Sequence, residues 1–132
     1  MHLKHRQTLE QERAAFAWAQ VRNRGGEKHL KDYRNLAKSA PALVAANGLL
    51  PTVLFYKGKG KPQHRFLLED LSTWLNTRAL PKRTQTDDSD ALVEALIQAS
   101  PAEYRQATDE TLQLLRWIRQ FVAAIGNDEN AS

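Results

Sequence analysis

The chain has 132 residues, of which 42% are hydrophobic and 26% are charged, the balance of an ordinary globular domain. It contains no cysteine, which excludes disulfides and thiolate metal sites. No apolar run approaches the roughly 20 residues of a membrane span, and the N-terminus lacks the apolar core of a signal peptide. We therefore expect a cytoplasmic protein with no membrane contact, folded as a single domain over residues 1–132, with disordered tails at 1–7 and 127–132.

The net charge of +4 conceals an uneven distribution. Residues 1–83 hold 16 Lys and Arg against 6 Asp and Glu, a balance of +10, whereas residues 84–132 hold 3 against 9, a balance of −6. A solvated surface with uneven charge is the simpler interpretation. We favour a basic surface that meets an anion and an acidic surface that meets a basic neighbour, because the basic part is also patterned on helix faces.

In chain order, helix signals recur from end to end, and alternation typical of strands is missing. The first helix is expected over about 8–24, where Thr8 and Gln11 form a possible capping box, and the second over about 27–47, closed by Gly48. Pro41 must kink that helix or restart it. Further helices are expected over 51–56, around Leu67–Leu75, around Leu92–Ile97 and over about 108–125, with a stop at Gly126-Asn127. The sequence thus predicts an all-α, compact single-domain bundle of about five to seven helices.

Apolar residues at helical spacing define the expected core. Between these helices, residues 80–90 form a polar loop, and Ser100-Pro101 forms a helix-start signal backed by Glu103. Trp74 and Trp117 lie on apolar stripes and are expected inside, whereas the position of Trp18 stays open. The core residues expected from spacing are Leu9, Phe16, Ala17, Val21, Leu30, Tyr33, Leu36, Ala37, Leu43, Val44, Leu67, Leu68, Leu71, Leu75, Leu92, Leu96, Ile97, Leu112, Leu115, Ile118, Phe121, Val122 and Ile125.

Two groups of cations stand out. Steps of three, three and four place four basic residues on one face of the second helix: Lys28, Lys31, Arg34 and Lys38. A comb of alternating lysine and glycine follows at Lys57, Lys59 and Lys61, where the glycines should leave the ammonium groups free to swing. A continuous positive surface of this kind suits a phosphate backbone.

Alternative chemistry has weaker support. Arg24 and His29 share the Arg-x4-His spacing of a class of small helical ribonucleases, although two glycines lie between them, and a site of this kind needs rigid placement. His2 and His5 could chelate a metal, but they stand on a terminus expected to fray. Asp87, Asp88 and Asp90 lack the glycine and final glutamate of a calcium loop. We expect no metal site and no cofactor.

The chain resembles a known family in a set of short segments that agree in order and spacing from about Arg13 to Ile125. The segments are Tyr33 to Pro41, Asn47-Gly48-Leu49, Phe55-Tyr56-Lys57, Tyr104-Arg105, Thr108-Asp109-Glu110 and Leu114 to Trp117. They are similar to those of the small subunit of the Cmr effector, the type III-B CRISPR RNA-guided interference complex. The resemblance implies a helical bundle without catalytic activity in antiviral defence. It also implies several stacked copies beside the other Cmr subunits, lining the channel in which guide RNA pairs with target RNA.

Residue by residue, the resemblance carries phosphate binding to Arg13, Arg34, Lys38 and Lys57. The helix-face and loop arguments add Lys31, Lys59 and Lys61 to this RNA-binding set. Binding would then be electrostatic and independent of base sequence. The acidic last third, with Asp109 and Glu110, could meet the basic face of the next copy. The alternatives are a small ribonuclease using Arg24 and His29, and an adaptor whose basic face binds an acidic protein.

Overall fold

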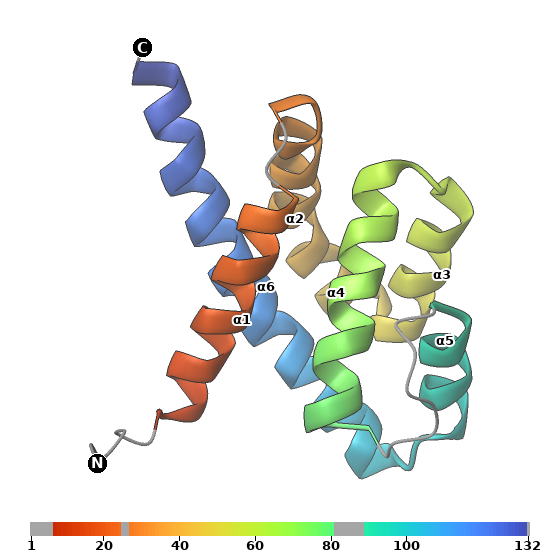
Figure 1. Ribbon diagram of the computed structural model, residues 1–132. Helices are drawn as coiled ribbons and strands as arrows, with labels where there is room; N and C mark the ends of the chain where they lie inside the picture. Colours follow the sequence, from red (N-terminus) through yellow and green to blue (C-terminus); the bar gives the residue numbers. More distant parts are fainter. Residues whose placement is uncertain (1–6, 25–26, 81–88, 132) are drawn as a thin grey trace.

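A computed structural model describes residues 7–24, 27–80 and 89–131, except the side chains of 27–28 and 126–131. Within these residues the chain forms six helices and no strand, which confirms the predicted all-α fold (Figure 1). None of the six is long and apolar enough to cross a membrane. The helices are α1 (Leu9–Asn23), α2 (Glu27–Asn47), α3 (Leu49–Lys59), α4 (Pro62–Arg78), α5 (Ser89–Gln98) and α6 (Pro101–Ala131).

The predicted start of α1 and end of α2 are confirmed. Thr8 is the N-cap of α1, and its hydroxyl accepts a hydrogen bond from the Gln11 backbone N–H while the Gln11 side chain accepts one from the Thr8 backbone. Gly48 is the single residue between α2 and α3, with φ of +95°, a conformation that favours glycine. Pro41 neither ends nor restarts α2, which continues through it as one helix.

The helix α3 is longer than expected, and this corrects the prediction for the lysine comb. It continues through Lys57 and Gly58 to Lys59, and Gly60, with φ of +67°, ends it. After Lys61, Pro62 begins α4 at once. The comb is therefore a tight corner between two helices, and not a flexible segment, because Gly58 keeps helical geometry inside the last turn of α3.

The last helix is also longer than expected at both ends. Ser100 caps it through reciprocal hydrogen bonds with Glu103, and α6 then runs without a break to Ala131. The expected stop at Gly126-Asn127 is wrong, because residues 127–131, where a disordered tail was expected, continue the helix. A glycine inside a helix costs about 1 kcal/mol relative to alanine, which does not by itself break a long helix.

The helix α6 is the central element of the core. It packs against α1, α2 and α4, whereas α3 packs against α2, α4 and α5.

The expected stripe of α4, from Leu67 to Leu75, is buried throughout. Leu114, which spacing did not single out, is fully buried, whereas Leu9 and Ile97 are 39% and 65% exposed and do not belong to the core. Both exposed residues lie near helix ends, where fewer neighbours cover a side chain. The predicted loop over 80–90 lies almost entirely outside the described residues.

Candidate nucleic-acid interface

The outer face of α2 carries the clearest cationic row. Lys31 and Lys38 are exposed and Arg34 is half-buried at one edge of the same face. The three side chains stand one helical turn apart, at the spacing of about 5–6 Å expected for positions three and four residues apart. None of them has a carboxylate partner among the described residues. Asp32 is an exposed neighbour on the same helix. The side chain of Lys28, the fourth expected member, lies outside the described residues.

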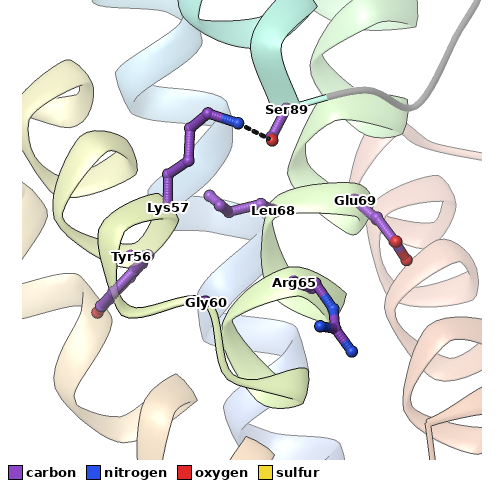
Figure 2. Close-up of a pocket in the computed structure, with 7 residues that line it drawn as sticks. All are labelled: Tyr56, Lys57, Gly60, Arg65, Leu68, Glu69 and Ser89. Atoms are coloured by element: carbon purple, nitrogen blue, oxygen red, sulfur yellow. Dashed lines mark hydrogen bonds between the residues drawn. The ribbon is translucent and has the colours of Figure 1, made fainter.

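The lysines of the α3–α4 corner differ from one another. Lys57 is held by α5, because its ammonium group lies 2.6 Å from an Asp90 carboxylate oxygen and donates a hydrogen bond of 2.8 Å to the Ser89 hydroxyl. Figure 2 shows this side chain reaching across the mouth of a hollow of about 260 Å³ toward Ser89. Arg65 and Glu69 line the same hollow, so its charge is mixed. Lys57 is therefore not free to swing, contrary to the prediction.

Lys59 and Lys61 are both exposed at this corner. The Lys59 ammonium group lies 5.1 Å above the Phe55 ring, and Lys61 precedes α4 without a side-chain cap. Their charge affects a neighbour: burial lowers the pKa of His64, and the positive charges of Lys59 and Lys61 lower it further. The corner therefore has a positive potential, which comes from its lysine side chains.

Arg13 lies between α1 and α6 and is mostly, but not fully, buried. Its guanidinium donates to both carboxylate oxygens of Glu110, at 3.0 and 2.6 Å, and the Trp74 indole N–H donates to the same carboxylate at 3.0 Å. The hydrogen bond from Arg13 holds the pKa of Glu110 below its usual range. This cluster joins α1, α4 and α6. The position of Arg13 argues against the phosphate contact expected for it, and we leave it out of the candidate interface.

The proposed ribonuclease pair is also used structurally. Arg24 donates hydrogen bonds of 3.0 Å to Glu69 and to Asp70, and its guanidinium lies 4.6 Å from the Phe66 ring centre. His29 contacts the same ring edge-on at 5.6 Å. Although the two residues are near each other, the arginine charge is matched by two carboxylates. It is therefore poorly placed to stabilise a phosphate.

The structure adds two cations that the sequence analysis missed. Arg116 and Arg119 of α6 are exposed and line a groove against Pro41 of α2. They belong to the acidic last third of the chain, so counting charge along the sequence assigned them to the wrong surface. The groove that they line borders α2 at Pro41, which lies two helical turns after Arg34 along the same edge of that helix.

Comparisons with known proteins agree with this helical bundle. The family model described as CRISPR-associated protein (Cas_Cmr5) matches residues 9–125. The chain belongs to the Cmr5 family. The resemblance to a Cmr small subunit seen in the sequence is thereby confirmed. One curated Cmr5 relative, from Thermus thermophilus, is named a CRISPR system Cmr subunit. It is 30% identical over 112 residues, which are 85% of this chain and 90% of the relative.

A solved Cmr5 structure shares the fold as well as the sequence. It is the crystal structure of a CRISPR-associated Cmr5 family protein, also from Thermus thermophilus, which is 30% identical in sequence. It superposes with a TM-score of 0.75 over 90% of this chain and 97% of the other.

Among the residues described here, no three His, Asp or Glu side chains converge as a metal-binding group.

Proposed function

We propose that this Cmr5-family chain is a non-catalytic subunit of the type III-B CRISPR effector, and that it holds the backbone of guide or target RNA. The observation that carries the proposal is the row of Lys31, Arg34 and Lys38 on the outer face of α2, for which the described part of the chain offers no carboxylate partner. Lys59 and Lys61 extend the cationic surface at the α3–α4 corner. Lys57 belongs to it in a smaller degree, because Asp90 already neutralises part of its charge.

The mechanism is electrostatic. Cations fixed on a helix release counterions from RNA when they contact its phosphates, and this gives affinity without reading bases. Each neutralised phosphate of a single strand contributes about 0.7 to the slope of log K against log salt. One copy with three contacts binds weakly at physiological salt, and stacked copies gain from the high effective concentration of successive sites.

Stacking needs a surface that can meet the basic face of a neighbour, and this revises the candidate residues. Asp109 is exposed on α6 and Glu94 on α5, so both can take part. Glu110 cannot serve in this way, because it is 4% exposed and accepts hydrogen bonds from Arg13 and Trp74. We keep the head-to-tail arrangement as a proposal that rests on the exposed carboxylates.

The test is the triple variant Lys31→Gln, Arg34→Gln and Lys38→Gln. Binding of a fluorescent oligouridine to the purified chain is followed by anisotropy over a series of salt concentrations, starting at low salt. We expect the salt slope to become shallower by about 2, the value for three lost contacts. The free energy of unfolding should change by less than about 0.5 kcal/mol per substitution, because Lys31 and Lys38 are exposed, Arg34 is only half-buried, and none of the three pairs with a carboxylate among the described residues.

A control that removes exposed arginine charge elsewhere is Arg22→Gln with Arg78→Gln, on α1 and at the end of α4. We expect the salt slope of RNA binding to fall much less per charge removed in this double variant than in the α2 triple variant. A triple variant that is well folded but keeps the wild-type slope would refute RNA binding by α2. RNA cleavage by the purified wild-type chain that disappears in His29→Ala would refute the non-catalytic role.

A further inference from the structure

We propose that the groove between α2 and α6 is a second phosphate-binding strip, in which Arg116 and Arg119 hold the same RNA strand that contacts the cationic row of α2. This inference rests on the proposed function and extends it to a helix that the charge distribution of the sequence assigned to the opposite surface. The groove has a volume of about 380 Å³. Its lining residues are Pro41, Leu112, Arg116, Arg119, Gln120 and Ala123.

The groove is continuous with the cationic row of α2. Pro41 follows Arg34 by seven residues, which is two helical turns, so both lie along the same edge of α2. Lys38 lies one turn before Pro41, toward the solvent. Figure 1 shows α2 and α6 running in opposite directions, and the two helices pack against each other. A strand that follows Arg34 and Lys38 along α2 toward Pro41 therefore comes to the groove that the two α6 arginines line.

The chemistry of the groove suits a nucleic-acid strand. Arg116 and Arg119 are three residues apart, so they stand next to each other on one face and can contact neighbouring phosphates. Guanidinium groups bind phosphate through paired hydrogen bonds, and Gln120 adds an amide. Pro41, Leu112 and Ala123 give an apolar floor against which a ribose or the face of a base can rest. No carboxylate is among the lining residues that the structure describes.

One acidic side chain lies close to the groove and has to be considered. A Glu10 carboxylate oxygen is 3.9 Å from an Arg116 nitrogen, and both side chains are more than half exposed, at 55% and 61%. An ion pair of this length and exposure contributes between about 0 and 1 kcal/mol. A phosphate can replace Glu10 at little cost. The continuity with α2 favours RNA over an acidic protein segment as the occupant.

Two variants separate this inference from the proposed function. In Arg116→Gln with Arg119→Gln, we expect the affinity for oligouridine to fall several-fold at low salt and the salt slope to become shallower by about 1.4, the value for two contacts. The control Arg22→Gln with Arg78→Gln removes the same charge away from the groove and should change the slope much less. The α2 triple variant is measured in parallel.

The absence of cysteine from the chain allows a direct readout as well. Ala123→Cys places a unique thiol at the groove, and Ala102→Cys places one on the exposed first turn of α6. After both are labelled with a photoreactive azide, we expect the Ala123 site to crosslink to oligouridine far more than the Ala102 site.

Each outcome decides one of the two statements. Wild-type affinity and slope in the groove variant, with loss in the α2 variant, would overturn the groove and leave the proposed function standing. Wild-type behaviour in both would overturn both. A groove variant that binds RNA normally but fails to enter the effector complex would also overturn the inference, because the groove would then hold a protein.

Discussion

The two sides of this bundle use the same residue types in opposite ways. Arg13 and Arg24 on the α1 side each meet a buried carboxylate, Glu110 and Asp70, and so join helices to one another. Lys31, Arg34 and Lys38 of α2 meet no carboxylate among the described residues. The position of a cation in the fold therefore decides whether it stabilises the protein or is available to a ligand.

The largest effect is expected at the buried pair of α1 and α6. In Glu110→Ala, the guanidinium of Arg13 and the indole N–H of Trp74 lose their acceptor. Breaking one partner of a buried pair costs about 3–5 kcal/mol, and we expect the lower end because Arg13 keeps 16% of its side chain exposed. Urea unfolding measures this loss.

Glu94→Ala, on the exposed face of α5, is the matched control and should change the free energy of unfolding by less than about 0.5 kcal/mol. If Glu110→Ala were no more destabilising than this control, Arg13 would not be a structural residue, and its exclusion from the RNA surface would be wrong.

A pH-dependent effect is expected at the second buried carboxylate. Asp70 is 1% exposed, and burial raises its pKa from 3.8 to about 6, although hydrogen bonds from Tyr33 and Arg24 oppose the rise. The folded state therefore binds this proton more tightly than the unfolded state. The resulting stabilisation is present below about pH 4 and is lost as the pH rises through 6.

In Asp70→Asn this dependence disappears. The stability of the variant minus that of the wild type should therefore increase between pH 4 and pH 7. A shift of about two pKa units corresponds to about 3 kcal/mol, the upper size of the increase. Tyr33→Phe should move the transition to higher pH, because it removes a hydrogen bond of 2.7 Å that lowers the pKa of Asp70. A difference that stays constant from pH 4 to pH 7 would contradict the raised pKa.

The smallest effect is expected at Lys57. This residue is intermediate between the cations that pair with buried carboxylates and those that are available to a ligand. Its pair with Asp90 is short, but the side chains are 38% and 68% exposed. Lys57→Gln should lower the free energy of unfolding by at most about 1 kcal/mol, and salt should weaken the difference further. Thermal unfolding at low and high salt measures both. A loss as large as that in Glu110→Ala would place Lys57 among the structural cations.

The sequence predicted the helices better than the charges because the two depend on different information. Thr8 with Gln11, Ser100 with Glu103, and the apolar stripe of α4 are local patterns, and each is confirmed. The partner of Arg13 is 97 residues away and that of Arg24 is 46 residues away, so no local pattern could reveal either. Likewise, the groove at Arg116 and Arg119 exists only because α6 packs on α2.

The lengths of the helices were harder to predict than their positions in the sequence. The lysine-glycine comb was expected to be a loop because glycine favours irregular backbone, yet Gly58 is helical and only Gly60 takes the left-handed conformation. Both glycines stand between two lysines, but Gly60 is followed two residues later by Pro62. The residue before a proline is disfavoured in helical geometry, and Lys61 has an extended ψ of 161°, so α3 has to end before Lys61. A glycine shortly before a proline is therefore a local stop signal, which Gly58 lacks.

The joint at Gly48 has a mechanical consequence. A one-residue connection has no slack, and an added Cβ would meet Pro51 at 3.5 Å and the Tyr104 hydroxyl at 3.7 Å. The Tyr104 hydroxyl also accepts a hydrogen bond of 2.8 Å from the Leu50 backbone N–H, which anchors the joint to α6. Inserting one residue here would lengthen the connection and change the direction in which α3 leaves α2. The cationic row of α2 and the lysines of the α3–α4 corner are therefore held in a fixed relative orientation. A change in the direction of one helix would also change the direction of the other.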